Sequence, residues 1–287
     1  MTNNEFSQEQ FGAMRTAFLT AYPKIFTNIN YSMEIFGNMK ELALKEGFAF
    51  APNLFNNEMA VEIEARHKAL SKALKKQLTS DSLVIEIAAG MSPRHLEFSE
   101  YNYVEVDFKP VMDIKSKIYK LIGKGELSKS LYAVDLSNVE RLREFLNKIV
   151  KTKKFSKIII VNEGLFWYLT KEQIATMTNE FTKAFTSLNW MWITSDCPPT
   201  DRCDDDYRKV ISSSAKVKRG TFADYADFTE FFESLGLSNV RCKLSDLLKY
   251  QDLTSARLFS VEEKDAVKKI DSYTDISVLR KFKTTRK

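Results

Sequence analysis

The sequence has few of the residues that build linkers and disulfide frameworks. It contains 6 prolines and 9 glycines in 287 residues, and no proline-rich or glycine/serine-rich stretch divides the chain. Its three cysteines, Cys197, Cys203 and Cys242, form no C-x-x-C pair, and their odd number argues against a disulfide framework. We therefore expect one large structural domain with reduced thiols.

Long apolar runs and a broadly basic surface are also missing. No run approaches the roughly 18 apolar residues of a membrane span, and the first ten residues lack the basic start and apolar core of a signal peptide. The net charge of +5 comes entirely from residues 264–287, which carry eight basic residues and three acids. Such charge runs are usually solvent-exposed, so we interpret this segment as a solvated tail. We expect a cytoplasmic protein with no membrane partner and no nucleic-acid partner.

The sequence does contain an apolar run that ends at a turn of small residues. Residues 83–88 read Leu-Val-Ile-Glu-Ile-Ala, Ala89 and Gly90 follow, and a second apolar run at 102–107 ends in Asp107. A strand, a tight turn and an acid about 20 residues further on are typical of a Rossmann-like unit that binds an adenosine cofactor.

The composition of this turn narrows the choice of cofactor. A dinucleotide site uses G-x-G-x-x-G to bring the backbone close to a pyrophosphate, whereas the corresponding positions here are Ala88, Gly90 and Pro93. S-adenosylmethionine has no phosphate, and it carries a sulfonium, an ammonium and a carboxylate. Glu86 beside the turn and Asp107, placed to accept the ribose hydroxyls, therefore favour S-adenosylmethionine.

Strands and helices alternate beyond residue 83. The pattern predicts strands at 83–88, 102–107, 131–134, 157–162 and 190–195, helices at 110–122, 137–151 and 171–187, and a late antiparallel pair at 239–244 and 256–261. Thr170 and Gln173 form a capping box at the start of the third of these helices. Residues 1–80 are expected to be helical, with an amphipathic helix over 59–78. This alternation predicts an α/β fold with a mainly parallel sheet.

Acids recur at or near the ends of four predicted strands, at Glu86, Asp107, Asp135 and Glu163. The ordered series 86–94, 104–110, 134–136 and 162–169 resembles the leucine carboxyl methyltransferase family, which includes phosphatase carboxyl methyltransferases and bacterial O-methyltransferases of polyketide-type metabolism. The resemblance implies a Rossmann-like methyltransferase fold: a seven-stranded sheet with an antiparallel last strand, helices on both faces and extra N-terminal helices. We expect a helical cap at 1–80 and a cofactor-binding core at 81–287, with an acceptor-side insertion at about 197–232.

The resemblance also implies roles for individual residues. Gly90 would lie against the methionine part of S-adenosylmethionine, and Asp107 would hold the ribose. Asp135 and Leu136 would meet the adenine, and Glu163 would lie beside the methionine amino group.

Two basic residues match the family in front of the first strand. Arg66 corresponds to the arginine that meets the cofactor carboxylate, and Lys24 is a weaker match to an N-terminal basic residue. The alternative for Arg66 is an ordinary pair with Glu62 on the helix surface. The chain departs from the family pattern at Ala88, where glycine is usual, and at Ser92–Pro93, where Asp-Thr is common.

Methyl transfer requires alignment, exclusion of water and an unprotonated acceptor. A carboxylate is already ionised at pH 7, whereas a phenol or an alcohol needs a general base. We interpret His67 and His95 as surface or capping groups, which favours a carboxylate or an acidic hydroxyl as the acceptor. Acceptor-side candidates come from the loops after the fourth and fifth strands: Tyr168, Asp196, Arg202 and Tyr207.

Two other clusters are interpreted without a functional role. Asp204–Asp206 lacks the spacing of a calcium loop and is read as a solvated acidic turn, so no metal is expected. The aromatic residues beyond it recur at helical spacing and are read as core rather than as the wall of an acceptor pocket: Phe222, Tyr225, Phe228, Phe231 and Phe232.

The leading hypothesis is an S-adenosylmethionine-dependent O-methyltransferase that acts on a small molecule or a carboxylate, and a protein substrate stays open. A non-catalytic module that keeps the cofactor site and recruits a partner is one alternative. An NAD-dependent oxidoreductase is another, because it shares the strand-turn-helix unit, although the glycines of its motif are missing.

Overall fold

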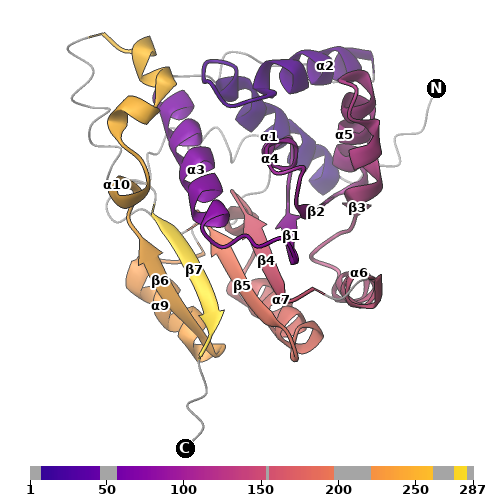
Figure 1. Ribbon diagram of the computed structural model, residues 1–287, viewed down its shortest axis with the longest axis vertical. Coiled ribbons are helices and arrows are strands. Elements are labelled where there is room, and N and C mark those ends of the chain that lie inside the picture. Colours follow the sequence, from indigo (N-terminus) through magenta and orange to yellow (C-terminus); the bar gives the residue numbers. More distant parts are fainter. Residues whose placement is uncertain (1–7, 46–56, 153–154, 197–220, 261–274, 283–287) are drawn as a thin grey trace, which may run out of the picture.

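A seven-stranded mixed sheet forms the centre of the molecule. The computed structural model describes residues 8–45, 57–152, 155–196, 221–260 and 275–282 (Figure 1). The strand order is β3-β2-β1-β4-β5-β7-β6. The strands are β1 (Ser82–Ile87), β2 (Asn102–Asp107), β3 (Leu131–Ala133), β4 (Lys157–Asn162), β5 (Asn189–Thr194), β6 (Leu237–Cys242) and β7 (Ile276–Lys281). β7 pairs antiparallel with β5 and β6, and the remaining pairings are parallel. The expected mainly parallel sheet with an antiparallel last strand is confirmed.

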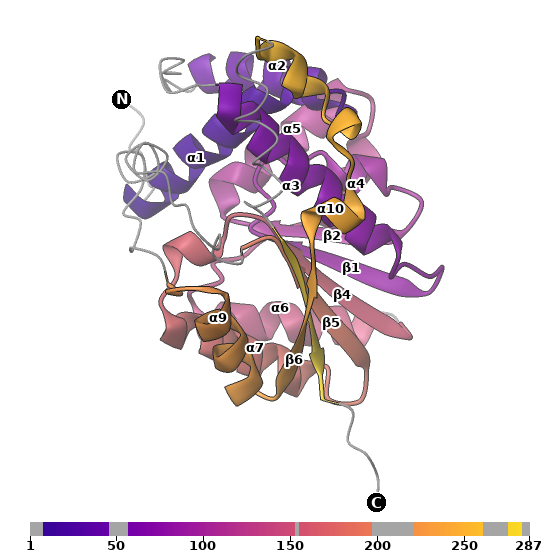
Figure 2. The same ribbon diagram turned by 90° about the vertical axis from the view of Figure 1, so that its left-hand side faces the viewer.

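Helices cover both faces of the sheet (Figure 2). One layer contains α6 (Val139–Thr152), α7 (Lys171–Ala184) and α9 (Tyr225–Ser234). The other contains α1 (Gln8–Lys24), α2 (Ser32–Lys45), α3 (Asn57–Lys75) and α5 (Lys109–Leu121). Short helical segments are α4 (Arg94–Glu97), α10 (Leu244–Leu247) and the 3-10 turns η2 (Gly125–Ser130), η3 (Phe166–Tyr168), η4 (Tyr250–Asp252) and η5 (Thr254–Leu258). None of the helices described here is long and apolar enough to cross a membrane.

The strands β1, β2, β4 and β5 are buried on both faces because each helical layer covers one set of alternating side chains. Leu83, Ile85 and Ile87 of β1 pack in the core beneath α6, α7 and α9, whereas Val84 packs against α3. This double burial explains the near-continuous apolar runs in the sequence.

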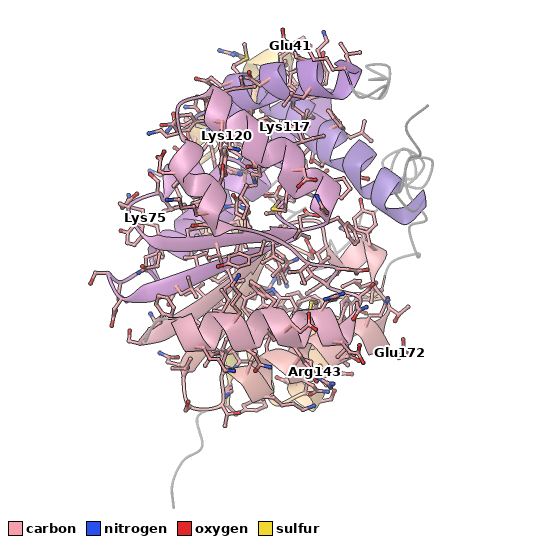
Figure 3. All side chains as sticks on the ribbon, turned by 90° about the vertical axis from the view of Figure 1, so that its right-hand side faces the viewer. Glu41, Lys75, Lys117, Lys120, Arg143 and Glu172 are labelled. Atoms are coloured by element: carbon pink, nitrogen blue, oxygen red, sulfur yellow. The ribbon has the colours of Figure 1, made fainter. Side chains whose placement is uncertain are left out.

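Helix α5 carries lysines of two kinds. Figure 3 shows Lys117 and Lys120 on its outer side, across the sheet from Arg143 on α6. Lys115, on the opposite side of the same helix, is fully buried. The helical periodicity of α5 therefore places Lys117 and Lys120 at the surface and Lys115 in the interior.

Five predicted strands and three predicted core helices are confirmed, with ends that differ by at most three residues. α7 begins at the predicted capping box: the Gln173 amide donates to Thr170 Oγ1 at 3.2 Å, and the Thr170 amide donates to Gln173 Oε1 at 2.9 Å.

The prediction of a strand at 256–261 is wrong. β6 pairs with β7, whereas residues 254–258 form η5. Directly before residues 256–261, the backbone amides of Thr254 and Ser255 donate to the Glu64 carboxylate on α3 at 3.0 and 2.8 Å, which holds the start of η5 against α3. The buried Ala256 and Phe259 are three residues apart, the spacing of a helical turn rather than of a strand.

The interpretation of 264–287 as a solvated tail is wrong for residues 276–281. These residues form β7, which lies between β5 and β6, and the side chains from Ile276 to Leu279 are buried. The clustering of basic residues concealed a short apolar stretch, Ile-Ser-Val-Leu, inside the same segment.

Candidate cofactor-binding site

The predicted site residues meet where the chain order of the sheet reverses. β2 and β3 lie on one side of β1, and β4 and β5 lie on the other. In open α/β sheets, ligands bind beyond the carboxyl ends of the strands at such a reversal. The Ala88–Gly90 turn follows β1, Asp107 ends β2, and Glu163 comes directly after β4.

The turn after β1 has a left-handed backbone at two residues. Ala88 and Gly90 both have φ of 50°, a conformation that glycine adopts freely and alanine adopts at a cost. A Cβ atom added to Gly90 would lie 3.8 Å from the Cβ of Ala17 on α1. Helix α1 therefore passes close over the turn.

Asp107 fixes this turn to the end of β2. Its Oδ2 accepts a hydrogen bond from the Gly90 amide at 2.7 Å, and its Oδ1 accepts one from the Phe108 amide at 2.7 Å. Burial raises the pKa of Asp107 to about 6, although the two amide donors oppose the shift. The carboxylate is therefore ionised at neutral pH, with lone pairs remaining for further donors.

Asp135 and Leu136 lie one strand further out, just beyond β3. Asp135 Oδ1 accepts hydrogen bonds from the Ser137 amide at 2.9 Å and the Ser137 hydroxyl at 2.6 Å, which forms a local turn. Leu136 packs against the core cluster under α6.

Five charged side chains gather beside the turn, on the face of the sheet that α3 covers. We call this group the charge cluster: Lys24, Arg66, Glu86, Arg94 and Glu163. Arg94 is completely buried and forms ion pairs with Glu86 and, at 2.9 Å, with Glu163. Arg66 lies 3.6 Å from Glu163 and also 3.2 Å from Glu62 on its own helix. The predicted helix pair of Arg66 with Glu62 is therefore present, and the predicted contact with the cofactor carboxylate stays a prediction.

Glu86 lies behind Arg94 rather than at the front of the charge cluster. One of its oxygens contacts the guanidinium, and the other accepts a hydrogen bond from the Tyr103 hydroxyl at 2.6 Å. The side chain is 2% exposed. Glu86 therefore contributes to the charge cluster by holding the Arg94 guanidinium.

The charge cluster holds an ionised carboxylate next to a buried ammonium. Burial alone would raise the pKa of Glu163, but the positive charges of Lys24, Arg94 and Arg66 outweigh it and hold this pKa far below its usual range. Lys24 is 5% exposed, and its burial lowers its pKa. No carboxylate among the residues described lies within ion-pair distance of the Lys24 ammonium. Such an arrangement suits a zwitterionic amino-acid group, whose ammonium would meet Glu163 and whose carboxylate would meet Lys24 and Arg66.

The interpretation of the two histidines as surface or capping groups is wrong, because both are buried. His67 contacts Arg94 and Glu97, each at 3.1 Å. His95 contacts Glu105 at 3.1 Å.

The sequence contained a signal for these buried contacts. Glu86 and Glu105 are neighbours in the register of β1 and β2, which are buried strands. A buried carboxylate requires a cation or several donors. Arg94 supplies the cation for Glu86, and Lys115 supplies it for Glu105, together with Tyr119 and His95.

Asp196 is the acceptor-side candidate with the most defined surroundings. Its carboxylate accepts hydrogen bonds from the amides of Gly164, Leu165 and Phe166 at 2.5, 2.6 and 2.9 Å, and from Asn162 Nδ2 at 2.6 Å. Burial raises its pKa. These contacts fix the backbone directly after Glu163.

The other acceptor-side residues are only partly described. Tyr168 ends η3 and is half-buried. Arg202, Tyr207, the acidic run Asp204–Asp206 and most of the predicted insertion at 197–232 lie outside the described residues. The core interpretation of the later aromatic residues is confirmed, because Phe222, Phe228 and Phe232 are buried in the same cluster as Phe166 and Trp192.

The sheet topology together with a family-model match defines the class of protein, an S-adenosylmethionine-dependent methyltransferase with a Rossmann-like fold. Residues 34–182, just over half of the chain, match the family model of leucine carboxyl methyltransferases. The chain belongs to this family, whose cofactor is S-adenosylmethionine. No curated protein matches the sequence.

Solved structures that are similar to this chain share little sequence with it. A Thermobifida fusca YX protein assigned as a methyltransferase has a TM-score of 0.52 and 13% identity, and the match covers 96% of each chain. The magnesium protoporphyrin IX methyltransferase of Synechocystis PCC 6803 has a TM-score of 0.45 and 11% identity, with 86% of this chain and 94% of that chain covered. The geranyl diphosphate C-methyltransferase of Streptomyces coelicolor A3(2) has a TM-score of 0.43 and 12% identity, with 74% and 76% covered.

Proposed function

We propose that this protein transfers the methyl group of S-adenosylmethionine to an oxygen atom, with a carboxylate of a small molecule as the preferred acceptor. The observation that carries the cofactor site of this proposal is the ionised Glu163, surrounded by the positive charges of Lys24, Arg66 and Arg94 at the carboxyl edge of the sheet. The bound cofactor supplies a methyl group on a sulfonium, which an in-line nucleophile can accept.

We infer that the charge cluster binds the methionine end of the cofactor. Glu163 receives the ammonium group, and Lys24 with Arg66 receives the carboxylate. Asp107 accepts hydrogen bonds from the ribose hydroxyls, and Asp135 and Leu136 border the adenine. Gly90 allows the methionine backbone to pass close to the turn because it has no side chain.

A carboxylate acceptor agrees with the chemistry of the surrounding side chains. His67 and His95, the two histidines of the sequence, are buried and engaged with carboxylates, so neither is free to remove a proton from an acceptor. A carboxylate is ionised at neutral pH and needs no such base. The family description, leucine carboxyl methyltransferase, supports the same acceptor class.

Nothing in the fold or the comparisons favours the two alternatives, a non-catalytic binding module and a nicotinamide-dependent oxidoreductase. We expect S-adenosylhomocysteine to bind saturably in calorimetry and NADH not to compete with it. A folded protein that binds NADH in preference would overturn the proposal.

The acceptor class is tested by the chemistry of the product. The protein is incubated with S-adenosylmethionine labelled in its methyl group and with a fractionated small-molecule extract. Mild alkali hydrolyses a methyl ester to volatile labelled methanol but leaves a methyl ether or a C-methyl group intact. We expect volatile label, and label that stays with the product would exclude a carboxylate acceptor.

A further inference from the structure

His67 lies between Arg94 and Glu97 in the interior of the protein. Arg94 Nη2 and His67 Nδ1 are 3.1 Å apart, and His67 Nε2 lies 3.1 Å from Glu97 Oε2. His67 is 1% exposed. The same Arg94 nitrogen donates to Glu163 Oε2 at 2.9 Å, so His67 is one residue away from the proposed ammonium site.

The chemistry of arginine determines where the imidazole proton lies. A guanidinium has only donors and stays protonated in proteins. The Nδ1 atom of His67 must therefore accept the Arg94 hydrogen bond, and its proton must lie on Nε2, which donates to Glu97. A doubly protonated imidazole would direct an N–H group at the guanidinium and break this contact.

The electrostatics around His67 agree with the neutral form. Burial lowers the pKa of His67 most strongly, and the charges of Arg94 and Lys24 lower it further, against the opposing effect of Glu97. Arg94 and Glu97 face the ring from α4, Lys24 from α1, and Glu163 from the loop after β4.

Ser71 also links Arg94 to Glu97, as His67 does. Arg94 Nε donates to Ser71 Oγ at 3.2 Å, and the Ser71 hydroxyl donates to Glu97 Oε2 at 3.4 Å. His67 and Ser71 are one turn apart on α3, and Arg94 and Glu97 are one turn apart on α4. The two helices thus hold the guanidinium plane in one orientation.

We propose that His67 is a positioning residue for cofactor binding: as the neutral Nε2–H tautomer it accepts from Arg94 and donates to Glu97, and it thereby orients the guanidinium that holds Glu163. The inference rests on the proposed function, since Glu163 is the group that would receive the cofactor ammonium. It assigns His67 no contact with the reacting atoms and no proton transfer.

Two substitutions separate this role from simple packing. His67→Gln keeps one acceptor and one donor on a side chain that does not titrate, whereas His67→Phe fills the space without an acceptor. We expect His67→Gln to bind S-adenosylhomocysteine within about threefold of the wild type. His67→Phe removes the acceptor for a charged donor, which corresponds to a loss of affinity of about tenfold or more. His95→Gln, at the other buried histidine, is the matched control and is expected to leave the affinity unchanged.

Nitrogen-15 NMR of labelled wild-type protein reads the tautomer without any ligand. The proposal predicts a protonated Nε2 and an unprotonated Nδ1 for His67, assigned by comparison with His67→Gln. A proton on Nδ1 would overturn it, and so would equal affinity of the wild type and His67→Phe, or His67→Gln as weak as His67→Phe. If the wild type itself fails to bind S-adenosylhomocysteine, the proposed function fails, and the tautomer measurement still decides whether the Arg94–His67–Glu97 arrangement exists.

Discussion

Replacing Asp107 with asparagine tests two claims together: that Asp107 binds the ribose, and that burial raises the pKa of its carboxyl group. Asp107 is 9% exposed, and its pKa is raised by burial to about 6 from the ordinary value of 3.8. A shift of about 2 pKa units corresponds to about 3 kcal/mol. Because the folded-state pKa is higher, the native protein binds this proton more tightly than the unfolded chain does. The carboxylate therefore costs stability as the pH rises from about 4 to above 6.

Asparagine at position 107 removes this cost but also weakens two hydrogen bonds. The amides of Gly90 and Phe108 lose a charged acceptor, but the pKa of about 6 already includes their effect on the carboxylate. We therefore expect the free energy of unfolding at pH 7 to stay the same or to rise, by at most about 3 kcal/mol. Between pH 5 and pH 7 the wild type loses stability as its Asp107 ionises, whereas the variant has no such group. Relative to the wild type, the free energy of unfolding of Asp107→Asn should therefore increase by about 1 kcal/mol over this range.

The affinity for cofactor is expected to respond much more strongly than the stability. Loss of charged hydrogen bonds to the ribose hydroxyls costs about 3 kcal/mol, or roughly 100-fold in the dissociation constant for S-adenosylhomocysteine. Urea unfolding at pH 5, 6 and 7 measures the first effect, and calorimetry measures the second. Asp113→Asn, which changes an exposed acid on α5, is the control. Binding by Asp107→Asn within about threefold of the wild type would refute the assignment of the ribose site.

Three further substitutions have expected outcomes. Ala88→Gly relieves the positive φ and should raise the free energy of unfolding by about 0.5–1 kcal/mol in urea titrations, and a lower value than in the wild type would contradict strain at this position. Arg94→Met leaves two buried carboxylates without their shared cation and should cost about 3–5 kcal/mol of stability, whereas a loss below 1 kcal/mol would contradict the burial of this ion pair. Asp196→Asn replaces an acceptor for three backbone amides and should lower stability by about 2 kcal/mol and weaken S-adenosylhomocysteine binding in calorimetry. Unchanged binding by this last variant would show that the loop after Glu163 keeps its position without Asp196.

The sheet was predictable because its signals are local. The run Leu83–Ile87 is buried on both faces and reads as a strand without reference to the rest of the chain. The capping box at Thr170 marks the start of α7 in four residues. β7 was not predictable in the same way, because its partners β5 and β6 lie far away in the sequence and its residues stand among basic ones.

Four of the five residues of the charge cluster were predicted as site residues from the sequence, and the fifth, Arg94, was not. Glu163 directly follows β4 and Asp107 is the last residue of β2, so their position at the carboxyl edge comes from the strand pattern. The sequence around Arg94 and His67 does not indicate that these side chains are buried. Their burial depends on the packing of α4 against α3. The one usable signal was Glu86, an acid within a buried strand that requires a cation nearby.

The most direct test of the account is a crystal structure of the protein with S-adenosylhomocysteine. The account predicts the ligand ammonium against Glu163, its carboxylate against Lys24 and Arg66, and its ribose hydroxyls on Asp107. A ligand whose amino-acid end lies away from Lys24 and Glu163, with these side chains positioned as described here, would contradict it.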